Sequence, residues 1–229
     1  MYKRNYIKKQ KCCLICFKAL NEDCSFSSLL NLNSTICNSC LKKFKVINKT
    51  IYVSTIETKI LYEYNNFIKT LLYQYKGCYD IELKDVFFYQ FKKEIKSKYK
   101  GYTIIYPPSY FKDDLDRGFI HIKEMIKCLS MPSLDLFVKT IKYKQSDQKF
   151  IDRKKVEKVI FLKNKSIKNI KYLIVDDIFT SGSTLRRIIR LLIENGVDKN
   201  NIKALILCKT ADFVELWYTI LIFFNINIF

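Results

Sequence analysis

The chain has 229 residues, of which 49% are hydrophobic and 15% aromatic. It can therefore bury a substantial core, and a predominantly disordered chain is excluded. Its formal net charge of +19 predicts affinity for polyanions such as nucleic acid, phosphorylated metabolites or acidic membranes. A second explanation of the charge stays open, because a composition rich in Lys, Asn and Ile and poor in Gly also suggests an A+T-rich genome.

The nine cysteines do not predict a disulfide framework. The basic stretch Met1–Lys11 is followed by an apolar run that Lys18 soon interrupts, so we expect no signal peptide. A reducing, cytoplasmic compartment is therefore predicted, and clustered cysteines in such a compartment more often bind metal.

Two Cys-x2-Cys pairs lie near the N-terminus, Cys13 with Cys16 and Cys37 with Cys40. Each pair can offer two thiolates to one ion, so the four sulfurs predict a tetrahedral, structural Zn²⁺ site. The stretch between the pairs is too polar and short to form a core, so the metal would supply its folding energy. We expect residues 1–50 to form a zinc ribbon and residues 51–229 to form an α/β domain.

Apolar periodicity predicts the next elements in chain order. They are helices over 56–72 and 81–99, a strand over 102–106, a charged loop over 112–116, a helix from about 119 to 129, and a strand over 134–141. His121 is the only histidine, and a general acid or base role is conceivable. We favour a helix residue without a catalytic role. The polar, basic stretch 142–155 has the length of a mobile active-site loop or an edge hairpin.

The C-terminal part predicts a strand over 171–175, a helix to residue 195 capped by Gly196, and a final strand over 203–208. The apolar tail Phe213–Phe229 is interrupted by polar residues. It falls short of the roughly twenty apolar residues that a transmembrane helix needs, so we expect no transmembrane segment.

The stretch Tyr172–Leu185 carries the strongest functional signal. Four apolar residues run into Asp176 and Asp177, a short Thr/Ser/Gly loop follows, and then a helical period begins. This pattern predicts a buried parallel strand that delivers a loop to a helix N-terminus. Main-chain amides and the helix dipole can hold a phosphate there, and Gly182 can adopt a positive φ that lets an anion approach. The loop adds hydroxyl donors from Thr180, Ser181, Ser183 and Thr184.

The two aspartates would repel a phosphate unless they face another part of the ligand. At the carboxyl end of the strand they can accept hydrogen bonds from sugar hydroxyls or lie near Mg²⁺. A ligand with a 5′-phosphate in the loop and its 2′ and 3′ hydroxyls on the acids is a ribose phosphate. The alternative is an ordinary strand–turn–helix with a Ser/Thr cap. A Walker loop and a GxGxxG fingerprint are excluded, because neither pattern occurs in the stretch.

The same stretch closely resembles the PRPP-binding motif of type I phosphoribosyltransferases. That motif is four apolar residues, two acids, then Thr-(Ser/Thr/Gly)-Gly-(Ser/Thr/Ala)-Thr. With the cysteine pairs ahead of it, the chain resembles the competence protein ComF family, bacterial proteins with a phosphoribosyltransferase-like domain implicated in DNA uptake. Further matching segments are Tyr75-Lys76-Gly77, the strand ending at Pro108, Arg117-Gly118-Phe119, and Gln145 with Arg153. Departures from the family pattern are Ile120-His121 for Asn-Gln, Val156 for Asn, and Tyr106 for Pro.

The resemblance implies a type I phosphoribosyltransferase-like parallel sheet with flanking helices, preceded by the small four-cysteine zinc ribbon. It also implies Mg²⁺ with PRPP, the 5′-phosphate lying on Thr180–Thr184 and the ribose on Asp176 and Asp177. A nucleophile would displace pyrophosphate at the anomeric carbon. Arg117 is then a candidate for stabilising the departing pyrophosphate, and with the two aspartates it forms the expected catalytic set. The resemblance does not specify the acceptor.

Two functional hypotheses stay open. The first is a PRPP-binding phosphoribosyltransferase or its catalytically silent relative. The second is a competence factor that binds single-stranded DNA through basic and aromatic surface and a zinc finger, with a regulatory or vestigial PRPP site. DNA-uptake or helicase proteins are the partners expected in either case.

Overall fold

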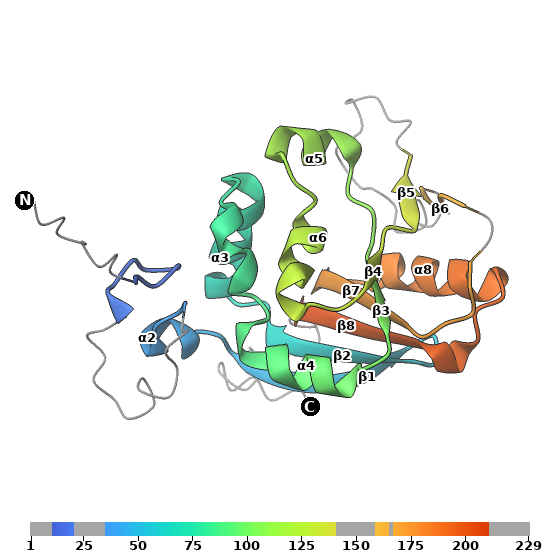
Figure 1. Ribbon diagram of the computed structural model, residues 1–229, viewed down its shortest axis with the longest axis horizontal. Coiled ribbons are helices and arrows are strands. Elements are labelled where there is room, and N and C mark those ends of the chain that lie inside the picture. The colour runs from blue at the N-terminus through green and yellow to red at the C-terminus, as the bar shows by residue number, and fades with distance from the viewer. Residues whose placement is uncertain (1–10, 21–34, 141–158, 165–166, 211–229) are drawn as a thin grey trace, which may run out of the picture.

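The computed structural model describes residues 11–20, 35–140, 159–164 and 167–210 (Figure 1). Its centre is a six-stranded sheet in the order β1-β2-β8-β7-β3-β4, and a two-stranded sheet pairs β5 with β6. The strands are β1 (Val46–Val53), β2 (Ile56–Glu63), β3 (Thr103–Ile105), β4 (Ser133–Leu134), β5 (Phe137–Lys139), β6 (Ile160–Leu162), β7 (Tyr172–Phe179) and β8 (Ile202–Lys209). The predicted mixed α/β fold with a mostly parallel sheet is confirmed.

The α-helices in the described residues are α2 (Asn38–Leu41), α3 (Asn66–Gly77), α4 (Lys92–Lys98), α5 (Phe111–Arg117), α6 (His121–Ile126) and α8 (Ser183–Glu194). Short 3-10 helices are η2 (Ile81–Asp85), η3 (Tyr89–Phe91), η4 (Lys127–Leu129) and η5 (Lys199–Asn201). None of these helices is long and apolar enough to cross a membrane. The stretch predicted over 142–155, the tail from Phe213, and the residues Gln145, Arg153 and Val156 lie outside the described residues.

Five strands of the large sheet run parallel, and β1 is its antiparallel edge. Alternate residues of β7 and β8 enter two different cores, because successive side chains of a strand point to opposite faces. Val175 and Leu205 join the core under α3, α4 and α6, whereas Ile174 and Ile206 join the core under α8. The central strands therefore read as continuous apolar runs, as expected for parallel strands covered on both faces.

The prediction of a helix over 56–72 is wrong for its first half. Residues 56–63 form β2, and α3 begins only at Asn66, where the Asn65 side chain accepts a hydrogen bond from the Ile68 amide. Ser54 and Thr55 both have positive φ and connect β1 to β2 in a tight hairpin. Such turns usually carry Asn or Gly, so the Ser-Thr pair gave no hairpin signal.

Three further expectations need correction. The single helix predicted over 81–99 is divided into η2, η3 and α4, and the charged segment 112–116 is not a loop but part of α5. The strand predicted over 134–141 is split between β4 and β5. The strands near 103 and 203 and the helix ending near residue 195 occur as predicted. The strand predicted over 171–175 continues to Phe179, so Asp176 and Asp177 lie within β7.

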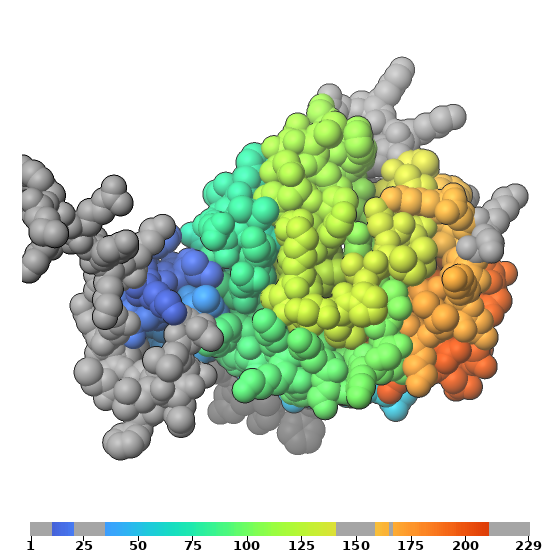
Figure 2. Space-filling view, in the orientation of Figure 1, coloured from blue at the N-terminus to red at the C-terminus, as the bar shows by residue number. Residues whose placement is uncertain are grey.

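The cysteine-bearing segment packs against the larger body. Cys13, Cys37 and Cys40 belong to the same buried cluster as Leu71 of α3. Figure 2 shows the atoms of the N-terminal segment lying against α3. The boundary predicted at residue 50 falls within β1, and the division into a zinc ribbon and an α/β domain stays a prediction.

Leu205→Ala is expected to lower the free energy of unfolding by ~2–5 kcal/mol, because it opens a cavity in the core. Leu205 is fully buried in β8, between β2 and β7. Urea denaturation followed by circular dichroism measures the loss. Leu134→Ala in edge strand β4 is the matched control, since that leucine is 42% exposed. Equal losses in the two variants would contradict the assigned core.

Candidate functional site

Strand β7 carries Asp176 and Asp177 to the carboxyl end of the parallel sheet. The two side chains leave the strand on opposite faces, as neighbouring residues of a strand do. Asp177 points toward α3 and α6 and is 7% exposed. Asp176 lies toward the loop before α8, and its Oδ1 accepts a hydrogen bond of 2.9 Å from the Asp177 amide. Burial raises the pKa of Asp176 to about 7, and the positive charge of Lys76 opposes that rise.

The loop after β7 has the geometry of an anion cradle. Gly182 has φ of +70° and precedes the first turn of α8, and no side chain caps that helix. A Cβ at Gly182 would lie 2.8 Å from the Phe179 ring, so only glycine fits without a shift. The Ser181 hydroxyl donates to Ser183 Oγ at 3.1 Å, and Arg186 Nη2 donates to the Ser181 carbonyl at 2.7 Å. The uncapped amides and the helix dipole leave this N-terminus suited to an anion.

A cavity of about 400 Å³ lies beside the two aspartates. Among its lining residues are Lys76, Arg117, His121, Asp176, Asp177 and Thr184. A smaller hollow next to it is lined by the loop, including Thr180, Gly182, Ser183 and Thr184, and again by Asp176. Asp176 and Thr184 border both spaces, so one ligand could span the loop and the aspartates. Ser181 lines neither space.

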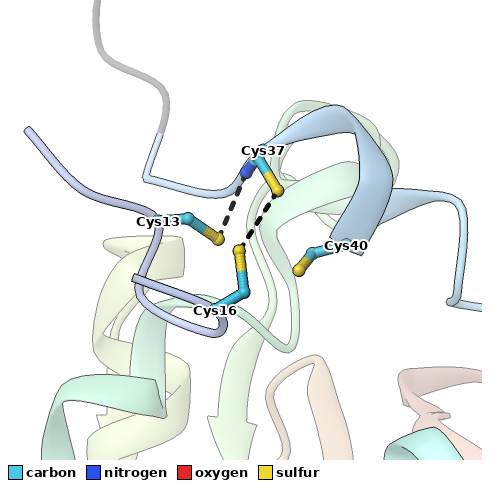
Figure 3. A group of neighbouring side chains, drawn as sticks. All are labelled: Cys13, Cys16, Cys37 and Cys40. Atoms are coloured by element: carbon cyan, nitrogen blue, oxygen red, sulfur yellow. Dashed lines mark hydrogen bonds between the residues drawn. The ribbon is translucent and has the colours of Figure 1, made fainter. Parts of the chain in front are cut away.

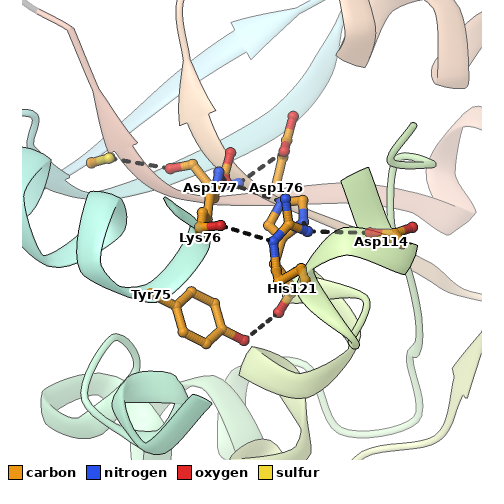
Figure 4. A network of polar contacts seen from close by, with 8 residues as sticks. Tyr75, Lys76, Asp114, His121, Asp176 and Asp177 are labelled. Atoms are coloured by element: carbon orange, nitrogen blue, oxygen red, sulfur yellow. Dashed lines mark hydrogen bonds and ion pairs between the residues drawn. The ribbon is translucent and has the colours of Figure 1, made fainter. Parts of the chain in front are cut away.

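Asp177 lies in a network of charged groups that comes from three separate segments (Figure 4). Its Oδ2 forms an ion pair with Lys76 Nζ and lies 3.2 Å from His121 Nε2. Arg117 Nη1 lies 3.3 Å from His121 Nδ1 and 3.2 Å from Asp114 Oδ1. Arg117 Nε donates to the Lys76 carbonyl at 3.2 Å, which ties the end of α3 to α5.

The network fixes the protonation of His121. A guanidinium can only donate, so His121 Nδ1 accepts from Arg117 and the ring proton is on Nε2, facing Asp177. Burial holds the pKa of His121 well below its usual value, and the charges of Lys76 and Arg117 lower it further. His121 is therefore neutral at physiological pH. The positive charge that balances Asp177 comes from Lys76.

The sequence predicted part of this arrangement. The structure places Asp176, Asp177, Arg117 and Thr184 around the main cavity. Of the other loop residues, Thr180, Gly182 and Ser183 border only the smaller hollow, and Ser181 borders neither. Lys76 was noted only as part of a segment that matches the family, and His121 was favoured as a residue without a catalytic role. A buried carboxylate needs a cationic or hydrogen-bonding partner, and this is the one signal that could have indicated Lys76 and His121 as partners of Asp177.

The four predicted metal ligands form a compact cluster (Figure 3). The sulfurs of Cys13, Cys16, Cys37 and Cys40 all lie within 4.8 Å of one another, and Cys16 Sγ is 3.6 Å from Cys37 Sγ. A tetrahedral ion with sulfur ligands at ~2.3 Å requires sulfurs about 3.8 Å apart, so the cluster fits such an ion. Burial opposes ionisation of Cys37, but hydrogen bonds from Ser39 and from the Cys40 main chain lower its pKa to about 6. The Cys37 amide also donates to Cys13 Sγ at 3.4 Å, as outer hydrogen bonds to metal-bound thiolates do.

Comparison with known proteins agrees with this geometry. A family model described as phosphoribosyl transferase domain matches residues 115–226, which include the β7–α8 loop. Competence protein ComFC of Streptococcus pneumoniae is 27% identical over 208 residues, covering 80% of this chain and 94% of that protein. These matches support a phosphoribosyltransferase-like protein of the ComF family. Competence protein ComFC of Bacillus subtilis is a second relative, 25% identical over 214 residues, covering 80% of this chain and 89% of that protein.

Solved structures of phosphoribosyltransferases are more distant from this chain than the ComFC relatives are. A hypoxanthine phosphoribosyltransferase from Staphylococcus aureus shares 16% identity at a TM-score of 0.32, and covers 55% of this chain. This chain spans less than two thirds of that enzyme, 61% of its length. An APRTase from Giardia lamblia, complexed with 9-deazaadenine, shares 14% identity at a TM-score of 0.36, covering 76% and 97% of the two chains. Because both TM-scores are below 0.5, the family assignment rests on the family model and the ComFC relatives.

Proposed function

We propose that this protein binds PRPP or a related ribose 5-phosphate ligand and serves DNA uptake in competence. The observation that carries the proposal is the shared border of the loop and the two aspartates. The uncapped amides after Gly182 are suited to the 5′-phosphate, and the carboxylates of Asp176 and Asp177 are suited to sugar hydroxyls.

Transferase turnover is the further step of this proposal. Asp176, Asp177 and Arg117 border one cavity, so they are the proposed catalytic set. Nη1 and Nε of Arg117 already contact Asp114, His121 and the Lys76 carbonyl. Because the Arg117 guanidinium is already held in place, it needs little reorganisation when negative charge develops on a departing pyrophosphate. We assign to Arg117 the role of stabilising that charge. Mg²⁺, which the sequence also predicts, would then accompany the diphosphate of PRPP, since Mg²⁺ commonly binds substrate phosphates and water.

Calorimetric titration with ribose 5-phosphate and with PRPP tests the binding proposal. We expect one site per chain for each ligand, and competition by inorganic phosphate, because the phosphate occupies the loop. A protein that is folded by circular dichroism and gives no heat with either ligand would contradict the proposal.

The affinity for ribose 5-phosphate should rise with pH. Because the pKa of Asp176 is raised to about 7, the carboxyl is mostly protonated at pH 6 and mostly ionised at pH 8. Only the ionised form accepts from two hydroxyls, so we expect up to about a tenfold gain in affinity over this interval. The ligand phosphate also titrates near pH 6, and the pKa of Lys76 is lowered to about 8, so Asp176→Asn serves to separate the share of Asp176 from theirs. Identical pH profiles for calorimetric affinity in the wild type and Asp176→Asn would contradict the assignment.

Two parts of the proposal concern partners and metal. Single-stranded DNA, with DNA-uptake or helicase proteins, is the partner suggested by the +19 charge and by the ComFC relatives. An oligonucleotide gel shift over a salt series tests it, and binding that does not weaken with salt would contradict an electrostatic surface. Zn²⁺ is the metal proposed for the four cysteines, and their use as thiolate ligands suits the reducing cytoplasm.

A further inference from the structure

The cation nearest the two aspartates belongs to the protein. Lys76 lies in the last turn of α3, and its ammonium forms an ion pair with Asp177 Oδ2. The Lys76 side chain is 25% exposed and borders the cavity. Burial lowers the pKa of Lys76 to about 8, and the charge of Asp176 opposes that change. The side chain is therefore still mostly charged at neutral pH.

Lys76 is held at this place by its backbone as well as by its charge. Arg117 Nε donates to the Lys76 carbonyl at 3.2 Å, and the hydroxyl of the preceding residue, Tyr75, donates to the His121 carbonyl at 2.7 Å. These bonds join the end of α3 to α5 and α6, which form the wall of the cavity opposite β7 (Figure 4). These hydrogen bonds hold the backbone at Lys76 in place, so the position from which its side chain extends is fixed.

A divalent ion held by these carboxylates does not fit the same geometry. Mg²⁺ requires six oxygen ligands at ~2.0–2.1 Å, and Asp177 Oδ2 already faces an ammonium and an imidazole N–H. Asp176 leaves the strand on the other face, and its Oδ1 is engaged by the Asp177 amide. In the described part of the chain, the only group of three or more potential metal ligands that converge is the cysteine cluster. Mg²⁺ can therefore reach this site with a diphosphate but is not held by the aspartate pair.

The charged side chains around the cavity indicate that Lys76 takes the place that Mg²⁺ would have there. Three basic side chains line it, Lys76, Arg117 and Lys139, and three acidic ones, Asp113, Asp176 and Asp177. With His121 neutral and Asp176 ionised, these charges balance only while Lys76 is present. Under the same condition, loss of Lys76 would leave the lining negative, and it would repel an anionic ligand unless a cation entered with it.

We propose that Lys76 is a resident cation of the sugar-phosphate site, so that this chain binds PRPP without requiring a divalent metal ion. An ammonium has three donors, and the two that do not face Asp177 remain for ligand oxygens. The inference rests on the proposed function and concerns the same cavity. It adds a residue, Lys76, and a property, independence from Mg²⁺, that the aspartates and the loop do not supply.

Calorimetric titration of PRPP into the zinc-loaded full chain tests the inference, in a buffer freed of Mg²⁺ by a chelating resin and in the same buffer with excess MgCl₂. We expect the wild-type affinity to differ by less than about threefold between the two buffers. Lys76→Met should lose about tenfold or more in the Mg²⁺-free buffer and regain most of that loss in MgCl₂. Lys76→Arg, which keeps a cation, should behave as the wild type. Lys69→Met, at an exposed position on the same helix, is the matched control and should change neither value.

The outcomes separate the inference from the proposed function. No binding of ribose 5-phosphate in either buffer would overturn the proposed function. If ribose 5-phosphate binds but the wild type binds PRPP only in MgCl₂, the proposed role of Lys76 is overturned and the proposed function stands. A Lys76→Met variant equal to the wild type in both buffers would also overturn it. If Lys76→Met does not fold by circular dichroism, Lys76→Gln replaces it, and the wild-type comparison remains decisive.

Discussion

Gly182→Ala is expected to lower the affinity for ribose 5-phosphate by about 30- to 100-fold. An alanine at φ of +70° is strained by ~1–2 kcal/mol, and its Cβ would lie 2.8 Å from the Phe179 ring. The loop can relieve both effects only by changing its backbone, which turns the amides of Gly182 and Ser183 away from a common point. Calorimetric titration measures the loss, and urea denaturation measures the accompanying change in stability.

Gly196→Ala is the matched control for that substitution. Gly196 follows the other end of α8 with φ of +87°, and an added Cβ there would meet nothing within 4 Å. We expect it to lose a similar amount of stability from backbone strain and to keep its affinity for ribose 5-phosphate. If Gly182→Ala bound the sugar phosphate as well as Gly196→Ala does, the loop would not be the phosphate site.

Cys16→Ser is expected to remove the metal from the N-terminal cluster and to loosen the segment that carries it. A closed site needs all four sulfurs, and structural Zn²⁺ contributes ~10–16 kcal/mol of binding free energy in zinc-finger peptides. Inductively coupled plasma mass spectrometry should find about one zinc per wild-type chain and almost none in the variant. Because Cys13 and Cys37 pack in the core with Leu71 of α3, we also expect a lower thermal midpoint for the whole protein.

Cys12→Ser provides the matched control for the metal. Cys12 is exposed and lies next to Cys13, but its sulfur is not part of the cluster. The variant should keep its zinc and its thermal midpoint. Equal zinc loss from Cys12→Ser and Cys16→Ser would show that the ligand set is different.

The sequence was most informative where a function depends on neighbouring residues. The strand, the paired aspartates, the loop and the start of α8 follow one another within Tyr172–Leu185, so their order alone predicts a strand that delivers a loop to a helix. The cysteine cluster was predictable for a similar reason, since each pair is local and the ion needs four ligands.

The partners of Asp177 could not be predicted in this way. Lys76 and His121 come from α3 and α6, and only the tertiary packing of these helices over one face of the sheet brings them to β7. Periodicity also failed at residues 56–63, where β-branched side chains of a strand lead into the apolar face of α3 without a Gly or Pro between them. A local pattern cannot choose between the two periods when the boundary carries no breaker.

The most direct test of the sugar-phosphate site compares ribose 5-phosphate with 2-deoxyribose 5-phosphate by calorimetry, in the wild type and in Asp176→Asn/Asp177→Asn. Hydrogen bonds to charged acceptors contribute ~1.5–3 kcal/mol, so the wild type should prefer the ribose ligand by about tenfold or more. The double variant should bind both ligands with nearly the same affinity, through the loop alone. Equal affinities in the wild type, or an undiminished preference in the double variant, would show that the aspartates do not face the sugar hydroxyls.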